Sequence, residues 1–236
     1  SNVNSESPTG RYSVTAIGSA RDVEITDRWT EETSVLSSVA SSISFSPDES
    51  QIAFTRRDPE AKLWDRMVSL NIANTDGSNR KAVLWAPITI VGWLPDGQTL
   101  LLQINTNSQI PSGLWKFDIS NLSLSKLLEA SHIHNIQISP NGGYLSYIRA
   151  LEPDTTLAGL WIFNTRDHTT TKLGVSGSYA WHPTSTGLLV VPPRPPGIMS
   201  HQFWWADLRG NPPIPITDPM ITHLQISNFE WVLAPD

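Results

Sequence analysis

Residues 43–54 read Ile-Ser-Phe-Ser-Pro-Asp-Glu-Ser-Gln-Ile-Ala-Phe, with alternating apolar residues on either side of a Pro-Asp pair. The alternation predicts two half-buried strands, and the proline and aspartate predict a tight turn between them, so the stretch is a β-hairpin signal. The same phrase returns at residues 91–102, 136–147 and 179–190. Because its prolines stand 43 to 48 residues apart, the chain is built from a repeat.

A second landmark lies 23 or 24 residues after each of these prolines. It is an apolar run that ends in Asp or Asn, and a turn and a further short apolar run follow it. The four runs are residues 68–71, 115–118, 161–164 and 204–207. Four strands in a unit of this length are typical of a β-propeller blade. We name the strands of a unit A to D in chain order, from the predicted central axis outward.

The two ends of the chain are expected to complete one blade together. Residues 7–14 align with residues 139–146, so the chain opens at an A–B turn and lacks strand A. Residues 12–17, 23–27 and 34–36 then read as strands B, C and D. The apolar segment 221–233 offers the missing strand, as residues 224–227 or 229–233, and closure in this way would leave no exposed sheet edge at the ring.

The sequence therefore predicts an all-β fold, a five-bladed β-propeller of four-stranded antiparallel blades whose ring is closed by the N- and C-terminal strands. We expect a single domain over residues 1–236. Its predicted repeat units are residues 7–37 plus 221–236, 38–85, 86–129, 130–174 and 175–220.

Composition excludes several classes of function. Apolar residues make up 39% of the 236 residues and the 14 glycines add about 6%, which together reach the range of a folded globular protein. A net charge of −6 leaves no basic surface for nucleic acid. The absence of cysteine excludes disulfides, thiolate zinc sites and thiol catalysis. The first ten residues are polar and no window approaches 18 apolar residues, so we expect neither a signal peptide nor a membrane span.

Three phrases carry a resemblance to a known family: Phe45-Ser-Pro-Asp48, Leu94-Pro-Asp-Gly97 and Ala73-Asn-Thr-Asp-Gly-Ser78. They resemble the TolB-like, WD-type β-propeller repeat, and the resemblance extends over nearly the whole chain. It departs from the pattern at Glu49, which replaces a glycine, at residues 182–185, and in the blade number, which is usually six in that family. The resemblance implies a protein-binding scaffold of the bacterial cell envelope, periplasmic or extracellular. The same repeat occurs in propellers that gate oligopeptidases, so it implies architecture more firmly than function.

One end of the predicted propeller carries the longer connections. Strands alternate in direction, so the B–C and D–A connections share an end, and residues 55–66, 105–113, 149–159 and 192–201 are long. Long loops on a rigid scaffold are where binding usually resides, although they can also be tolerated insertions. The first loop gathers the densest charge of the chain around a tryptophan, and Trp and Arg are common hot-spot residues. We predict a protein partner at this end, with contacts from Arg56, Arg57, Trp64, Asp65, Arg66, Arg194 and His201.

Tryptophans mark the predicted core. Trp115, Trp161 and Trp204 recur in register in the C strands, and we expect them to be buried between blades. Trp93 and Trp181 occupy matching positions in A strands and are also expected in the core.

Catalytic motifs are weak. His132 and His134 would share one face of a strand without an acidic partner at metal spacing. Residues 174–178, Gly-Val-Ser-Gly-Ser, lack the strand–turn–helix context of a nucleophilic serine. Glu152 and Asp154 suit glycoside chemistry only at a separation that sequence does not give. We expect no enzyme activity, no cofactor and no metal. Two alternatives stay open: a carbohydrate-binding or carbohydrate-active propeller, and a regulatory propeller detached from a hydrolase.

Overall fold

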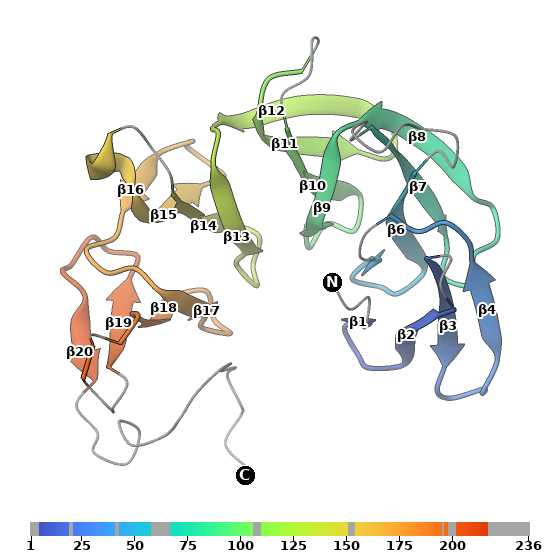
Figure 1. Cartoon of the computed structure of the whole chain (residues 1–236), viewed down its shortest axis with the longest axis horizontal. Helices are drawn as coiled ribbons and strands as arrows, with labels where there is room; N and C mark the ends of the chain where they lie inside the picture. The colour runs from blue at the N-terminus through green and yellow to red at the C-terminus, as the bar shows by residue number, and fades with distance from the viewer. Residues whose placement is uncertain are drawn as a thin grey trace. The chain divides into compact units, whose positions relative to one another are not determined.

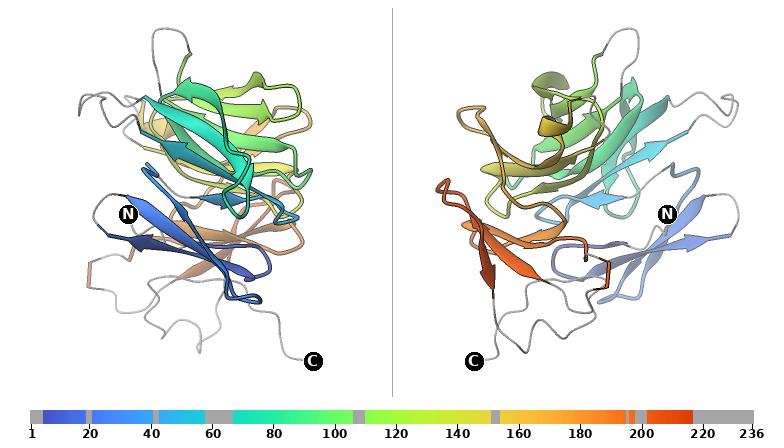
Figure 2. Two further views of the ribbon diagram at one scale, coloured as in Figure 1. Left: turned by 90° about the vertical axis from the view of Figure 1, so that its right-hand side faces the viewer. Right: turned by 60° about the vertical axis from the view of Figure 1, so that its left-hand side comes forward.

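The computed structural model describes residues 5–18, 21–40, 43–57, 67–105, 110–150, 154–194, 196–197 and 202–216. Within these ranges the chain forms five antiparallel sheets of four strands each, and none of these residues is in an α-helix. Every sheet is a meander whose strands lie side by side in chain order (Figures 1 and 2). The all-β prediction and the four strands of each repeat are confirmed.

The first three sheets are formed by residues 5–129. The first sheet comprises β1 (Ser5–Glu6), β2 (Tyr12–Ile17), β3 (Asp22–Asp27) and β4 (Thr33–Leu36). The second comprises β5 (Ser44–Phe45), β6 (Gln51–Arg56), β7 (Val68–Asn74) and β8 (Lys81–Ala86). The third comprises β9 (Ile88–Trp93), β10 (Thr99–Ile104), β11 (Gly113–Asp118) and β12 (Ser123–Glu129).

Two further sheets are formed by residues 133–216. The fourth sheet comprises β13 (Ile133–Ile138), β14 (Tyr144–Arg149), β15 (Gly159–Asn164) and β16 (Thr170–Lys172), with a short 3-10 helix η1 (Thr155–Leu157) between its second and third strands. The fifth comprises β17 (Ser178–Trp181), β18 (Gly187–Val191), β19 (Phe203–Asp207) and β20 (Ile214–Ile216). The chain divides into two compact units, residues 1–131 and 132–236.

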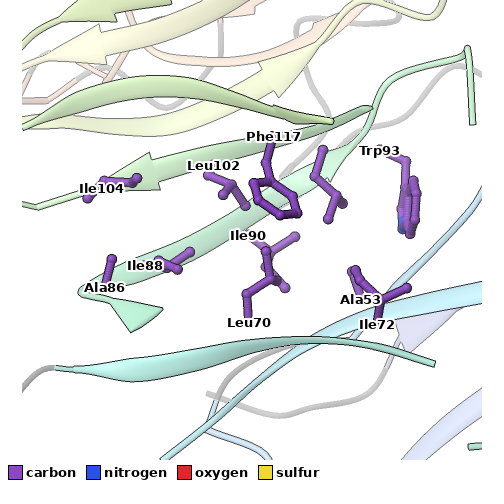
Figure 3. Packing of buried hydrophobic residues seen from close by; sticks show 11 residues of the cluster. Ala53, Leu70, Ile72, Ala86, Ile88, Ile90, Trp93, Leu102, Ile104 and Phe117 are labelled. Atoms are coloured by element: carbon purple, nitrogen blue, oxygen red, sulfur yellow. The ribbon is translucent and has the colours of Figure 1, made fainter. Parts of the chain in front are cut away.

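Within each unit the core lies between consecutive sheets. Figure 3 shows the cluster shared by the second and third sheets, where Leu70 lies opposite Ile90 and Phe117. Burial of such side chains stabilises the fold by about 1.5–3 kcal/mol each. Trp93 and Trp181 are both 7% exposed, which confirms their prediction as core residues. The Trp93 indole Nε1 donates to the Ser44 carbonyl of the preceding sheet at 3.0 Å.

The A–B turns form because their own side chains close them. In the second sheet the Ser46 hydroxyl accepts the Gln51 amide at 3.0 Å, and the Asp48 carboxylate accepts the Ser50 amide at 3.1 Å. Hydrogen bonds from the Ser46 hydroxyl and from Ser50 lower the pKa of Asp48. The hairpins predicted from the Ser-Pro phrases are therefore present, and the chemistry that predicted them holds them together.

The expectation that the chain lacks the first A strand is wrong. Ser5 pairs with Val14 and Glu6 pairs with Ser13, so β1 occupies the position next to β2. This strand is two residues long and polar, and it therefore carries no alternating apolar signal. The predicted closing segment, residues 221–233, lies outside the described residues.

The two departures from the repeat have a common explanation. Glu49 and Ser185 stand where other turns have glycine, and both keep the left-handed backbone, each with φ of 59°. Glu49 accepts the Thr9 amide at 2.7 Å, and Ser185, 4% exposed, accepts the Asn141 amide at 3.0 Å. Both donors come from the equivalent turn of the preceding sheet. At these two places a side chain links neighbouring sheets at the expense of backbone strain.

Two substitutions of Glu49 should separate the cost of its left-handed backbone from the contribution of its hydrogen bonds to Thr9. Glu49→Ala keeps the strained backbone and loses the hydrogen bonds, so we expect a loss of about 1–2 kcal/mol in the free energy of unfolding. Glu49→Gly loses the same hydrogen bonds but removes the backbone strain, so its free energy of unfolding should fall by less than that of Glu49→Ala. Urea denaturation of both variants checks this. If the alanine variant is as stable as the glycine variant, the strain assigned to Glu49 is absent.

Candidate functional site

The B–C connections share one end of each sheet, as predicted, but the connection of the second sheet is shorter than the expected residues 55–66. Thr55 and Arg56 are the last residues of β6, and Thr55 is fully buried, so the loop begins at Arg57. The B–C connection of the fourth sheet also contains regular structure, since η1 lies within it. The expectation that residues 55–66 form one loop is therefore wrong at its start, because the strand continues for two residues.

The structure places three of the seven predicted contact residues. The half-buried Arg56 directs its Nε to the Ser37 carbonyl at 3.1 Å, and the half-buried Arg57 follows it. Arg194 is exposed in the connection after β18. Arg56 and Arg57 belong to the first compact unit and Arg194 to the second. The other four, Trp64, Asp65, Arg66 and His201, lie outside the described residues.

Two of the C-strand tryptophans form hydrogen bonds with the B–C connections that precede them. The Trp115 indole Nε1 donates to the Pro111 carbonyl at 3.3 Å, and that of Trp161 donates to the Leu157 carbonyl at 2.8 Å. In both cases the acceptor lies four residues earlier, inside the B–C connection. The guanidinium of Arg149 also lies 5.7 Å from the Trp161 ring centroid, which ties the start of the same connection to the strand that follows it.

These tryptophans are half-buried, so the expectation of full burial between sheets is wrong. Trp115 and Trp161 direct their indole Nε1 to a loop carbonyl, and Trp115 and Trp204 also pack against the core from its edge. The Trp204 Nε1 is buried and has no hydrogen-bond partner within the described ranges. A large exposed aromatic lies at the same end. Trp85 of β8 is 54% exposed and pairs with Ser69, which stands near the start of β7, just after the B–C connection of the second sheet.

The polar groups considered for catalysis serve other roles where the structure describes them. His132 and His134 are exposed, and no group of three or more His, Asp or Glu in the described part of the chain is placed to hold a metal. Residues 174–177 lie in the connection between β16 and β17, and Ser178 begins β17. Asp154 accepts the Thr156 hydroxyl at 2.6 Å and its amide at 2.9 Å, which lowers the pKa of Asp154. It therefore caps η1 as a carboxylate.

Other aspartates close turns in the same way. Asp118 accepts the Ser120 hydroxyl at 2.6 Å, and Asp167 accepts the Thr169 hydroxyl at 2.7 Å. Those hydroxyls, and the amides of the same residues, lower the pKa of each carboxyl. A general acid needs a raised pKa, so these groups have the opposite property. Glu152 lies outside the described residues.

The opposite end of the sheets, which carries the A–B and C–D turns, is hollowed by clefts. Three clefts lie at equivalent places there, each between the outer strands of one sheet and the C–D turn of the next. Their volumes are about 820 Å³ between the second and third sheets, 520 Å³ between the fourth and fifth, and 490 Å³ between the first and second. Sequence periodicity could not reveal them because they arise from packing between repeats.

The cleft between the first and second sheets is acidic. Its lining includes Asp27, Glu32 and Asp76, against the single cation Arg11. The Arg11 Nε donates to Asp27 at 3.0 Å, and this contact is the main reason that the pKa of Asp27 falls to about 2. The guanidinium also lies 4.7 Å from the ring of Trp29, which is 70% exposed.

Comparison with known proteins assigns the fold. No family model and no curated protein matches the sequence. The structure is similar to TolB from Acinetobacter baumannii, with a TM-score of 0.61 and 13% identity over 86% of this chain and 51% of that one. It is similar to a putative TolB from Agrobacterium tumefaciens, with a TM-score of 0.62 and 13% identity over 91% and 79% of the two chains.

A third similar structure is the β-propeller domain of the Trilobed protease from Pyrococcus furiosus, with a TM-score of 0.61 and 16% identity over 88% of this chain and 70% of that one. The chain thus spans about half the length of the Acinetobacter TolB. None of the described residues belongs to a helix long and apolar enough to cross a membrane. The chain has the β-propeller fold that the TolB proteins share.

Proposed function

We propose that the chain is a non-catalytic propeller scaffold that binds a protein partner at the end carrying the B–C and D–A connections. The observation that carries the proposal is the anchoring of these connections by the indoles of Trp115 and Trp161. A loop with a fixed base loses less conformational entropy on binding, which favours recognition. The exposed Trp85 at the same end supports it, since partly exposed tryptophans are common anchors in interfaces.

We further propose that the five sheets are the five blades of one closed propeller, a single domain over residues 1–236. The equal strand number and common order of the sheets support this. We still propose that residues 221–233 close the ring by pairing with the N-terminal sheet. The resemblance to TolB proteins supports a location in the cell envelope, periplasmic or extracellular.

The proposed contacts combine an aromatic anchor with a charged rim. Trp64 is the proposed anchor, and the proposed charged and polar contacts are Arg56, Arg57, Asp65, Arg66, Arg194 and His201. Rim charges mainly alter the association rate and its salt dependence, whereas loss of a buried anchor mainly speeds dissociation.

A partner captured from the envelope fraction of the native cells tests the proposal. Against that partner, Trp64→Ala should raise the dissociation rate at least about 30-fold, as loss of a hot-spot residue does. Asp96→Lys, a charge change in a turn at the other end, is the control and should leave the rate unchanged. If Asp96→Lys weakens binding of the partner and Trp64→Ala leaves it unchanged, the partner binds at the end with the A–B turns and the proposal is wrong.

A regulatory propeller of a hydrolase is the second candidate, and the similarity to the Trilobed protease domain favours it. The gene sequence distinguishes the two candidate functions. A regulatory propeller requires a reading frame that also encodes a hydrolase domain, whereas a separate scaffold does not.

A further inference from the structure

The largest of the three clefts, which we call the β8 groove, differs from the other two in its lining. It is formed by β7 and β8 of the second sheet and the turn between β11 and β12 of the third, all within the first compact unit. Its volume is about 820 Å³. Ile72, Val83, Ile119 and Leu122 give it an apolar wall.

Leu122 is the unusual member of that wall. It is 56% exposed and holds a left-handed backbone with φ of 58°. The equivalent turn positions of the first and fourth sheets are Glu31 and His168, which have similar φ values of 62° and 61° and are polar. An exposed leucine in a strained conformation contributes little to folding, so a contact that covers it is the better explanation.

The charge of the β8 groove is also distinctive. Lys81 lines it, and its lining contains no carboxylate, whereas the cleft between the first two sheets holds three. Among the described residues Lys81 has no ion-pair partner, and the amide side chains of Gln51 and Asn79 have no hydrogen-bond partner. An occupant with a carboxylate would therefore find a cation and two free amides in the groove.

The backbone at the groove favours an extended occupant. β8 is the outermost strand of its sheet, so one side of it carries amide and carbonyl groups that do not pair within the sheet. Such an edge accepts a further strand, with main-chain hydrogen bonds giving affinity and side-chain pockets giving specificity. The ladder to β7 is irregular between Leu70 and Asn71, which leaves Val83 out of register.

We propose that the β8 groove binds an extended segment of a partner protein in which aliphatic residues alternate with Asp or Glu. The aliphatic side chains cover Leu122 and Val83, and a carboxylate pairs with Lys81. The segment adds to the free edge of β8. This site lies at the turn end of the second sheet, so it is separate from the proposed loop-end partner site and does not depend on it.

Fluorescence anisotropy of the whole chain with a labelled peptide tests the proposal. The probe is Gly-Ser-Asp-Leu-Asp-Ile-Asp-Leu-Asp-Ser-Gly, and saturable binding is expected with a Kd below about 1 mM. A peptide with Lys in place of each Asp, and one with Ser in place of each aliphatic residue, should each bind at least about 10-fold more weakly.

Two variants locate the site. Lys81→Glu and Leu122→Asn should each weaken the acidic peptide about 10-fold, and asparagine tolerates the backbone at position 122 so that folding is retained. Arg166→Glu, the same charge change at an exposed turn of the second unit, should leave binding unchanged. Thermal melts check that each variant is folded, and Leu122→Gly replaces Leu122→Asn if that variant is not.

The proposal is overturned if the acidic peptide shows no saturation, if the lysine peptide binds equally well, or if the Lys81 and Leu122 variants bind like the wild type. It is also overturned if sedimentation shows that the chain self-associates and that Leu122→Asn abolishes this, because the occupant would then be a second copy. Binding of the acidic peptide that both variants weaken, with Arg166→Glu unaffected, supports it.

Discussion

Replacing Gly177 with alanine should lower the free energy of unfolding by about 3 kcal/mol, the upper part of the range for overpacking. Gly177 precedes β17, and the neighbouring Ser178 pairs with Val191 at the end of β18. A Cβ at position 177 would meet the carbonyl oxygen of Val191 and lie 2.6 Å from the Cα of Pro192. Both are backbone atoms, so no side-chain rotation relieves the clash, and the two strands must separate locally.

Gly174 provides the matched control for this substitution. It lies in the same connection between β16 and β17, and a Cβ there would make only ordinary contact with Pro213 at 3.5 Å. Gly174→Ala should change the free energy of unfolding by less than about 0.5 kcal/mol. Denaturant unfolding of the two variants gives the comparison. Equal stability of the two would mean that the close approach of residue 177 to the β18 end is absent.

Replacing Trp181 with alanine should cost about 3–5 kcal/mol, the usual loss for a buried large aromatic side chain. Trp181 is 7% exposed and stacks on Tyr144 of the preceding sheet with ring centroids 6.2 Å apart. Its Nε1 donates to the fully buried Ser146 hydroxyl at 2.8 Å. Truncation therefore removes core volume and leaves a buried hydroxyl without its donor.

A phenylalanine at position 181 separates these two contributions. Trp181→Phe keeps most of the ring and loses the donor, so it should cost about 1–2 kcal/mol. Trp85→Ala, which truncates a 54% exposed tryptophan, should cost less than about 0.5 kcal/mol. A loss below about 1 kcal/mol for Trp181→Ala would show that the fourth and fifth sheets do not pack through this residue.

Features that local chemistry dictates could be predicted from the sequence. The A–B turns follow from Ser, Pro and Asp at fixed offsets, because Ser46 and Asp48 close the turn in which they stand. The C strands end at Asp or Asn for the same reason: Asp207 accepts the Arg209 amide at 2.9 Å and so begins the next turn. Alternating apolar residues then placed the strands to within a few residues.

Features that depend on packing between repeats could not be predicted. β1 is short and polar, and only its pairing with β2 identifies it as a strand. The ring of Trp161 was expected in the core, but its indole bonds to a loop carbonyl, and a tryptophan in a C strand suits either role. The departure at Glu49 was visible in the sequence, whereas the donor that explains it, Thr9, lies 40 residues away.

In the candidate site, too, the sequence predicts some features and does not reveal others. Chain topology alone predicts that B–C and D–A connections share an end, and antiparallel pairing within each sheet agrees with this. The clefts at the other end had no sequence signal, because their lining comes from two repeats at once. Leu122 was a possible indicator, as an aliphatic residue in a turn position that is polar in the first and fourth sheets.

Amide hydrogen exchange of the whole chain, with and without a partner captured from the envelope fraction, tests the central proposal most directly. Binding at the loop end predicts slower exchange in residues 57–67, 105–112, 150–158 and 192–202. The A–B turns at residues 46–50, 94–98 and 139–143 should exchange at the same rate in both states. Protection confined to those turns, with no change in the B–C connections, would contradict the account.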